Sequence, residues 1–215
     1  MPNVLTSLEI DLRWLAGIAG LATLAYAIFN TFYAQSRPVK IYTGAARKVL
    51  RTPYLILATI LFLALGYILW KPLPVQLPLL LQLFVSILGA VLFFSGLVLY
   101  IWGRRALGES FNVSTGFGVR LTQAHRLVTN GPFAYVRHPM YIGVILACWG
   151  GLLLYRTWTM LWLSVIMLGL IFRARKEEQA LAQVYGRQWE LYQRYVPAWF
   201  PRLDRMLGRS PTHHR

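Results

Sequence analysis

Five long apolar stretches dominate the chain, and polar segments rich in arginine and lysine separate them. Trp14–Tyr33, Pro53–Trp70 and Pro78–Trp102 contain no charged residue. A bilayer core about 30 Å thick needs about 20 apolar helical residues, because lipid cannot satisfy exposed backbone amides. These stretches therefore predict three transmembrane helices. A cleaved signal peptide is the competing interpretation of the first one, but Glu9 and Asp11 precede it and the apolar run is too long.

The last two apolar stretches are shorter and lie close together. Pro139–Tyr155 and Thr157–Phe172 are uncharged and 17 and 16 residues long. At about 1.5 Å per residue, each forms a helix about 25 Å long. They predict a tight helical hairpin around Arg156. Both a full crossing and a hairpin that stops short of the far membrane surface are compatible with these lengths.

Composition and charge placement support a membrane protein. The 215 residues are 57% hydrophobic and 13% charged, values outside the range of a soluble globular domain. Lys and Arg number 22 against 7 Asp and Glu. All but Arg13, Lys71 and Arg156 lie on one side of the predicted helices. Lys and Arg are retained on the cytoplasmic side of a membrane. The N-terminus is therefore expected outside and the C-terminal tail inside. We expect a multi-pass protein of a bacterial inner membrane.

The basic segments also suggest which partners to expect. Contact with anionic membrane lipids explains them without a nucleic-acid partner, since no recognition module accompanies the charge. After the hairpin, mostly apolar and aromatic residues, with one glutamine, recur at three- and four-residue spacing, which predicts an amphipathic helix on the membrane face. The members of this pattern are Leu181, Val184, Tyr185, Gln188, Tyr192 and Tyr195.

These patterns define a fold class and two regions. We predict an all-α integral membrane protein with about five transmembrane helices, the last two a short hairpin, and a cytoplasmic C-terminal amphipathic helix. Residues 1–102 form the first three helices. Residues 103–215 form the expected catalytic region, made of a cytoplasmic loop, the hairpin 139–172 and the tail. Neither the oligomeric state nor a packing role for the small residues of the first helix follows from the sequence.

Candidate chemistry gathers in the two cytoplasmic segments that flank the hairpin. His138 precedes the helix that starts at Pro139, and Tyr141 shares a face with it in the first turn. Free backbone N–H groups and the helix dipole attract an anion there, such as a carboxylate or a phosphate. The structural alternative is an interfacial anchor that fixes the depth of the helix.

A second candidate group lies where the hairpin leaves the membrane. Arg173 and Glu177 are four residues apart and share a helix face, whereas Glu178 is turned by about 100°. A surface ion pair is the simple interpretation. Two adjacent carboxylates at the membrane boundary, in a chain with so few acids, are nevertheless functional candidates. No metal-ligand spacing, Gly-x-Ser-x-Gly elbow or P-loop is present, so no metal is expected.

Two ordered motifs resemble a known family. The run His125–Gly143, HRLVTNGPFAYVRHPMYIG, closely resembles the signature of the isoprenylcysteine carboxyl methyltransferase family. Phe172 through Glu178, followed by Tyr185-Gly186 and the segment 192–197, resembles the C-terminal signature of the same family. Together these motifs cover roughly residues 105–200.

The resemblance implies a membrane methyltransferase that uses S-adenosyl-L-methionine in a cytoplasm-facing pocket roofed by the tail. Glu177 would bind the cofactor, and Arg173 would meet the substrate. Phe133 stands where family members often have tyrosine, and Tyr195-Val196 stands where the animal enzymes commonly have a basic-Val pair, so the resemblance does not extend to the residues tied to their prenylated protein substrate. The other implied pocket residues are His125, Arg126, Leu127, Val128, Phe133, His138, Pro139, Met140 and Tyr141.

The methyl acceptor stays open at this stage. A lipophilic acceptor could arrive sideways from the bilayer. A carboxylate needs no base, whereas an amine or thiol would need Glu178 or His138 to remove a proton. An NADPH-dependent reductase of the sterol type is the nearest rival, although such enzymes usually follow Arg-His with Asn-Tyr rather than Pro139-Met140-Tyr141. A scaffold or transporter fits less well, because the apolar helices hold few polar residues.

Overall fold

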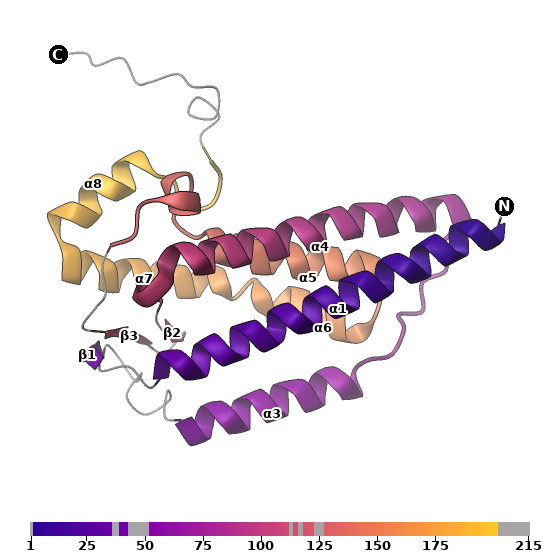
Figure 1. Cartoon of the computed structure of the whole chain (residues 1–215), viewed down its shortest axis with the longest axis horizontal. Helices are drawn as coiled ribbons and strands as arrows, with labels where there is room; N and C mark the ends of the chain where they lie inside the picture. The colour runs from indigo at the N-terminus through magenta and orange to yellow at the C-terminus, as the bar shows by residue number, and fades with distance from the viewer. Residues whose placement is uncertain are drawn as a thin grey trace, which may run out of the picture.

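The computed structural model describes residues 2–35, 39–42, 52–111, 114–115, 118–122 and 127–201. Long helices in these residues lie side by side in an elongated bundle (Figure 1). Each of the five apolar stretches contributes a helix to it, as predicted. In chain order the helices are α1 Pro2–Gln35, α3 Thr52–Ile68, α4 Leu79–Leu107, α5 Pro139–Tyr155, α6 Trp158–Met167, α7 Leu170–Tyr185 and α8 Arg187–Tyr195.

The helices identify a membrane protein by their length and apolar character. In the described part of the chain, three helices are long and apolar enough to cross a membrane, over Thr6–Ala34, Leu79–Ser110 and Trp158–Tyr185. Ile56–Ile68 and Pro139–Tyr155 are apolar but shorter. The number of five crossings therefore stays a prediction, as does the orientation of the chain in the bilayer.

The hairpin turns at Arg156, as predicted, but its second arm differs from the expected single helix. Arg156 adopts the left-handed conformation with φ of 52° and ends α5. The helix expected to continue to Phe172 ends at Met167, and α7 begins after Gly169. Leu168 and Gly169 keep right-handed helical backbone angles, and hydrogen bonds between residues three apart replace the α-helical pattern there. The break is therefore a tightened turn between two helices, and the apolar span Trp158–Tyr185 still contains both of them. The continuation through α7 extends the second arm well beyond the predicted boundary.

α4 and α5 approach each other closely because glycines face each other across their contact. A Cβ atom built on Gly96 would lie 2.5 Å from the carbonyl oxygen of Gly143. One built on Gly150 would lie 2.3 Å from the backbone nitrogen of Phe93. Small residues of this kind let helix backbones come together in a membrane. This contact fixes the start of α5 against the end of α4, where the polar motifs lie.

Replacing Gly150 with alanine is expected to lower the free energy of unfolding by about 1–3 kcal/mol, because the added methyl group must push α5 away from α4. Titration of the purified protein with SDS measures this change. Gly66→Ala in α3 is the matched control, since its Cβ would meet Thr159 at 3.7 Å. That control is expected to be neutral or to stabilise by about 0.5–1 kcal/mol. Equal losses in the two variants would contradict the close α4–α5 contact.

A small sheet at one end of the bundle was not predicted from the sequence. β1 Val39–Tyr42 pairs antiparallel with β3 Gly118–Thr122, which also pairs with β2 Ser114–Thr115. The strands join the connection after α1 to the connection after α4. Runs this short carry too little alternation to be separated from loops by sequence alone. The other regular elements of the described residues are helices, as expected.

Candidate active site

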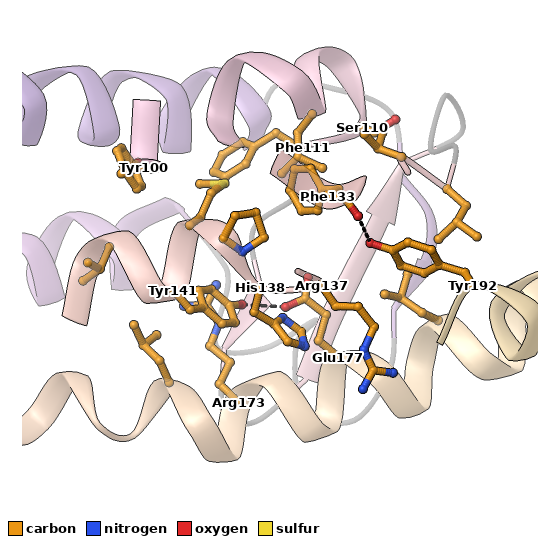
Figure 2. A pocket seen from close by; sticks show the side chains of 18 of the residues that line it. Tyr100, Ser110, Phe111, Phe133, Arg137, His138, Tyr141, Arg173, Glu177 and Tyr192 are labelled. Carbon is orange, nitrogen blue, oxygen red and sulfur yellow. Dashed lines mark hydrogen bonds between the residues drawn. The ribbon is translucent and has the colours of Figure 1, made fainter. Parts of the chain in front are cut away.

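A cavity of about 300 Å³ lies where α4 ends and α5 begins (Figure 2). Its walls come from α1, α4, the segment 127–144, α7 and α8. His125 and Arg126, also predicted for this site, lie outside the described residues. The predicted residues that line the cavity are Leu127, Val128, Phe133, His138, Pro139, Met140, Tyr141, Arg173 and Glu177.

Glu177 and Tyr141 form the polar centre of the cavity. The Tyr141 hydroxyl donates a hydrogen bond of 2.5 Å to Oε2 of Glu177. The Arg173 guanidinium carbon lies 5.3 Å from the centre of the Tyr141 ring. Arg173 and Glu177 are one helical turn apart on α7, which brings both side chains to the same face. The structure thus brings together one carboxylate, one cation and one phenol from the two sequence motifs.

Glu178 occupies a different position from its neighbour Glu177. Its Oε1 lies 2.7 Å from Nε2 of His138 and 3.4 Å from Nε of Arg137. Among the described residues, Glu178 is not part of the cavity lining. Its contacts with His138 and Arg137 thus lie beside the cavity and not inside it. This geometry favours a positioning role for Glu178 over direct contact with a bound molecule.

The chain after α8 crosses the start of α5 and covers it. The backbone N–H groups of Arg137 and His138 donate to the carbonyl oxygens of Pro197 and Ala198, at 2.9 and 3.2 Å. The rings of His138 and Trp199 are 5.3 Å apart between centres. His138 keeps only 6% of its surface exposed. This contact places the described part of the tail over one wall of the cavity.

α8 closes another wall of the cavity. Trp189 is buried, and its ring lies 5.7 Å from the guanidinium carbon of Arg137. The Tyr192 hydroxyl donates to the carbonyl oxygen of Phe133 at 2.7 Å. Burial raises the pKa of Tyr192 above its usual value, against a smaller opposing effect of Arg137. Tyr192 therefore stays protonated at neutral pH and keeps this donor.

Several residues of the cavity were not predicted. Arg137 lies inside the first motif, beside His138, and this position could have identified it as a cavity residue. Trp189 lies four residues after Tyr185 and three before Tyr192, so it fits the amphipathic spacing but was not included in the predicted pattern. The residues on α1 and near the end of α4 gave no signal, because nothing local indicates that these segments meet the motifs. The missed lining residues include Thr31, Tyr100, Leu107, Ser110, Phe111, Arg137, Trp189 and Tyr192.

The lining combines charge with apolar surface. Arg137, Arg173 and Glu177 carry formal charges, while aromatic and aliphatic side chains such as Phe133 and Leu181 form much of the remaining wall. A cavity of this kind suits a molecule with ionic groups at one end and a flat or apolar body at the other. Within the described residues, no group of three His, Cys, Asp or Glu side chains is placed to hold a metal ion.

Residues 84–188 match the model of the phospholipid methyltransferase family. The matched region begins in α4 and ends in α8, so it contains the α4–α5 contact and most of the cavity. This part of the chain is therefore similar in sequence to phospholipid methyltransferases.

A similar protein is the protein-S-isoprenylcysteine O-methyltransferase of Schizosaccharomyces pombe, with 35% identity over 79 residues. The match covers 36% of this chain and 34% of that protein, so the chain spans about a third of the relative's length. The two matches confirm the resemblance to the isoprenylcysteine carboxyl methyltransferase family that the motifs predict.

Proposed function

We propose that this protein is a membrane-embedded, S-adenosyl-L-methionine-dependent methyltransferase that methylates the carboxylate of a lipophilic acceptor of the isoprenylcysteine type. The cavity that combines Glu177, Tyr141 and Arg173 is the observation that carries this proposal. The similarity of residues 84–188 to a methyltransferase family supports it, because that region supplies all three side chains.

The residues present fit the groups of the cofactor. S-adenosyl-L-methionine has a carboxylate, an ammonium group, a ribose diol and an adenine ring, and it supplies a methyl group on a positively charged sulfur. Glu177 suits the diol or the ammonium group, and the start of α5 beside His138 suits the carboxylate. Phe133 and Leu127 offer apolar surface to the purine. The protein then contributes alignment of the reactants and exclusion of water.

The carboxylates of the site favour an acceptor that needs no base. Both carboxylates already have a hydrogen-bonding partner. Glu177 accepts a hydrogen bond from Tyr141, and Glu178 is hydrogen-bonded to His138. A carboxylate acceptor is already nucleophilic at neutral pH, so Arg173 needs only to orient it. The name of the matched family supports a second candidate, a phospholipid amine. In that case His138, held by Glu178, would receive the proton.

The acceptor is proposed to enter from the bilayer. Val144 on α5, and Met167 and Leu170 on either side of the α6–α7 break, form an apolar wall of the cavity. A chain that lies among the helices can reach the cavity along this wall while its reactive end stays near Arg173. We place the cavity and the tail on the cytoplasmic side of a bacterial inner membrane, with the N-terminus outside, because the basic residues gather there.

Calorimetry of the detergent-purified protein with S-adenosyl-L-methionine tests the cofactor. The wild-type protein is expected to bind it in the micromolar range. Glu177→Ala and His138→Ala should each weaken binding by about tenfold or more, because each removes a polar partner from a partly dry site. Glu190→Ala is the matched control, since Glu190 is an exposed acid on α8, and its affinity should equal that of the wild type.

A parallel titration with NADPH separates the proposal from the reductase alternative. Binding of NADPH by a folded wild-type protein that ignores S-adenosyl-L-methionine would overturn the proposed methyltransferase. Binding of S-adenosyl-L-methionine that Glu177→Ala leaves unchanged would instead refute the role given to this carboxylate. Circular dichroism of each variant shows whether the helices are intact in either outcome.

A further inference from the structure

A second, larger cavity of about 1020 Å³ lies among α1, α3, α4, α5 and α6. Along α1 its lining extends from Ile10 to Ala27, a rise of about 25 Å at 1.5 Å per residue. This length is close to the thickness of a bilayer core. Nearly all the lining is apolar. Among the described residues that line this cavity, Arg13 alone carries a charge.

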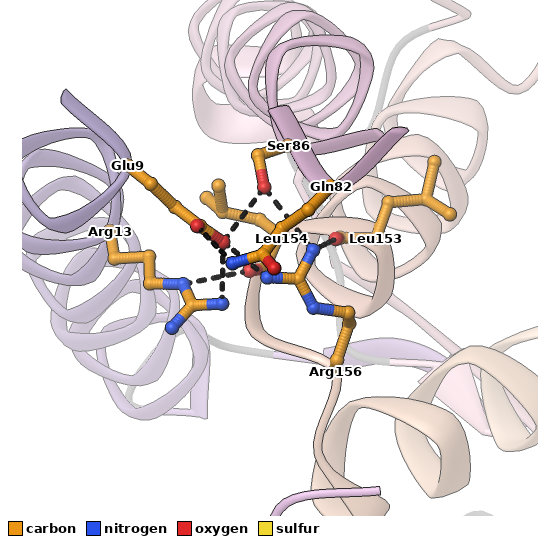
Figure 3. Close-up of polar contacts among 7 residues, drawn as sticks. All are labelled: Glu9, Arg13, Gln82, Ser86, Leu153, Leu154 and Arg156. Atoms are coloured by element: carbon orange, nitrogen blue, oxygen red, sulfur yellow. Dashed lines mark hydrogen bonds and ion pairs between the residues drawn. The ribbon is translucent and has the colours of Figure 1, made fainter. Parts of the chain in front are cut away.

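Arg13 contacts the end of α5, whereas the candidate active site lies at the start of that helix, and Arg13 belongs to a cluster of polar side chains (Figure 3). Its Nη2 donates to Glu9 at 2.7 Å, and its Nε donates to the carbonyl oxygen of Leu154 at 3.0 Å. Glu9 also accepts hydrogen bonds from Arg156, Gln82 and Ser86. Two guanidinium groups thus share one carboxylate, which leaves the cluster with one net positive charge.

The exposure of the three charged side chains shows where this charge is accessible. The Glu9 side chain is 5% exposed and that of Arg156 is 15% exposed, whereas 35% of the Arg13 side chain is exposed. A cation beside an apolar cavity is costly in a membrane unless an anion or water compensates it. A hydrocarbon chain alone would remove water from Arg13 without replacing it. A hydrocarbon chain that ends in an anionic group fits the apolar cavity and also compensates the charge of Arg13.

We propose that this cavity binds a phospholipid of net negative charge from the leaflet opposite the candidate active site. Its phosphate lies at Arg13, and one acyl chain lies along α1 toward Ala27. The bound lipid fills the space between α1 and α3 and neutralises the cluster. This site is separate from the proposed methyl transfer and does not depend on it.

The competing occupant is the hydrocarbon chain of a methyl acceptor. Tyr100 and Val144 line both cavities, so such a chain could pass from the active site toward α1. An acceptor chain would bring its apolar end to Arg13, however, and the charge there favours a headgroup. The two occupants differ in one measurable property, because only a lipid headgroup at Arg13 gives a preference for negative charge.

Thermal unfolding in a non-ionic detergent, followed by tryptophan fluorescence, tests the proposal with phosphatidylglycerol and phosphatidylcholine of the same acyl chains. Phosphatidylglycerol is expected to raise the midpoint by about 5 °C more than phosphatidylcholine, since a ligand of the native state stabilises it. Arg13→Gln should abolish this difference. Lys71→Gln should retain it, because Lys71 is an exposed cation near the same end of the bundle and does not line the cavity.

A second variant fills the cavity and leaves the charges in place. A Cβ built on Gly66 meets Thr159 at 3.7 Å, so Gly66→Leu can extend into the cavity without a backbone clash. This variant is expected to unfold at least as high as the wild type without lipid and to lose the lipid-dependent shift. The proposal is overturned if both lipids stabilise the wild type equally, or if the preference for phosphatidylglycerol persists in Arg13→Gln or Gly66→Leu. None of these readouts requires methyl transfer.

Discussion

Changing Glu9 to glutamine is expected to lower the free energy of unfolding by about 3–5 kcal/mol, because it leaves two guanidinium groups in the membrane without a counter-charge. Glu9 is buried and accepts hydrogen bonds from Arg13, Arg156, Gln82 and Ser86. These partners come from α1, α4 and the α5–α6 turn, so one carboxylate joins three parts of the bundle. The loss is measured as an earlier transition in an SDS titration of the protein in mixed micelles.

Asp11→Asn provides the matched control for Glu9. Asp11 is two residues away on the same helix and is exposed, so removal of its charge should change stability by less than about 0.5 kcal/mol. The double variant Glu9→Leu with Arg156→Leu should recover part of the stability, since it removes an uncompensated charge along with the carboxylate. A Glu9→Gln protein as stable as Asp11→Asn would refute the joining role of the cluster.

The membrane helices could be predicted because their signal is local. An uncharged stretch such as Pro78–Trp102 must satisfy its backbone within itself, and this leaves the helix as its available structure in lipid. The break at Gly169 could not be predicted, since a single glycine lowers helix propensity without fixing where a helix ends. The Glu9 cluster was equally hidden. Glu9 and Arg156 are far apart in the sequence, and only the folded bundle brings them together.

The candidate site was predictable as far as its motifs reach. Helical spacing places Arg173 and Glu177 on one face and Glu178 on another, and the structure confirms this separation. Spacing alone could not show that Glu178 pairs with His138, because that contact joins α7 to the start of α5. Phe111, near the end of α4, could not be predicted either. Its place in the cavity depends on how the chain returns to the bundle after α4.

Arg173→Ala is expected to lower kcat/KM for the acceptor by about 100-fold, because a charged group that orients and stabilises the reacting carboxylate contributes about 2.7 kcal/mol. Affinity for S-adenosyl-L-methionine should change by less than about threefold, since the proposal assigns cofactor binding to Glu177 and the start of α5. Arg173→Lys should give an intermediate rate, because lysine keeps the charge and loses the planar two-pronged donor. Methyl transfer to a prenylated cysteine analogue, measured with labelled cofactor, supplies both constants.

Arg175→Ala separates this role from a general effect of basic charge near the membrane. Arg175 is exposed, lies on another face of α7 and does not line the cavity. If attraction of an anionic acceptor to the membrane surface were the main contribution, both variants would raise KM alike and salt would reduce the effect. If Arg173 orients the acceptor, its loss reduces kcat as well, and salt does not restore it. Equal losses of kcat/KM in Arg173→Ala and Arg175→Ala would therefore show that basic charge acts by attracting the acceptor to the membrane surface. They would refute the role of Arg173 in orienting the acceptor.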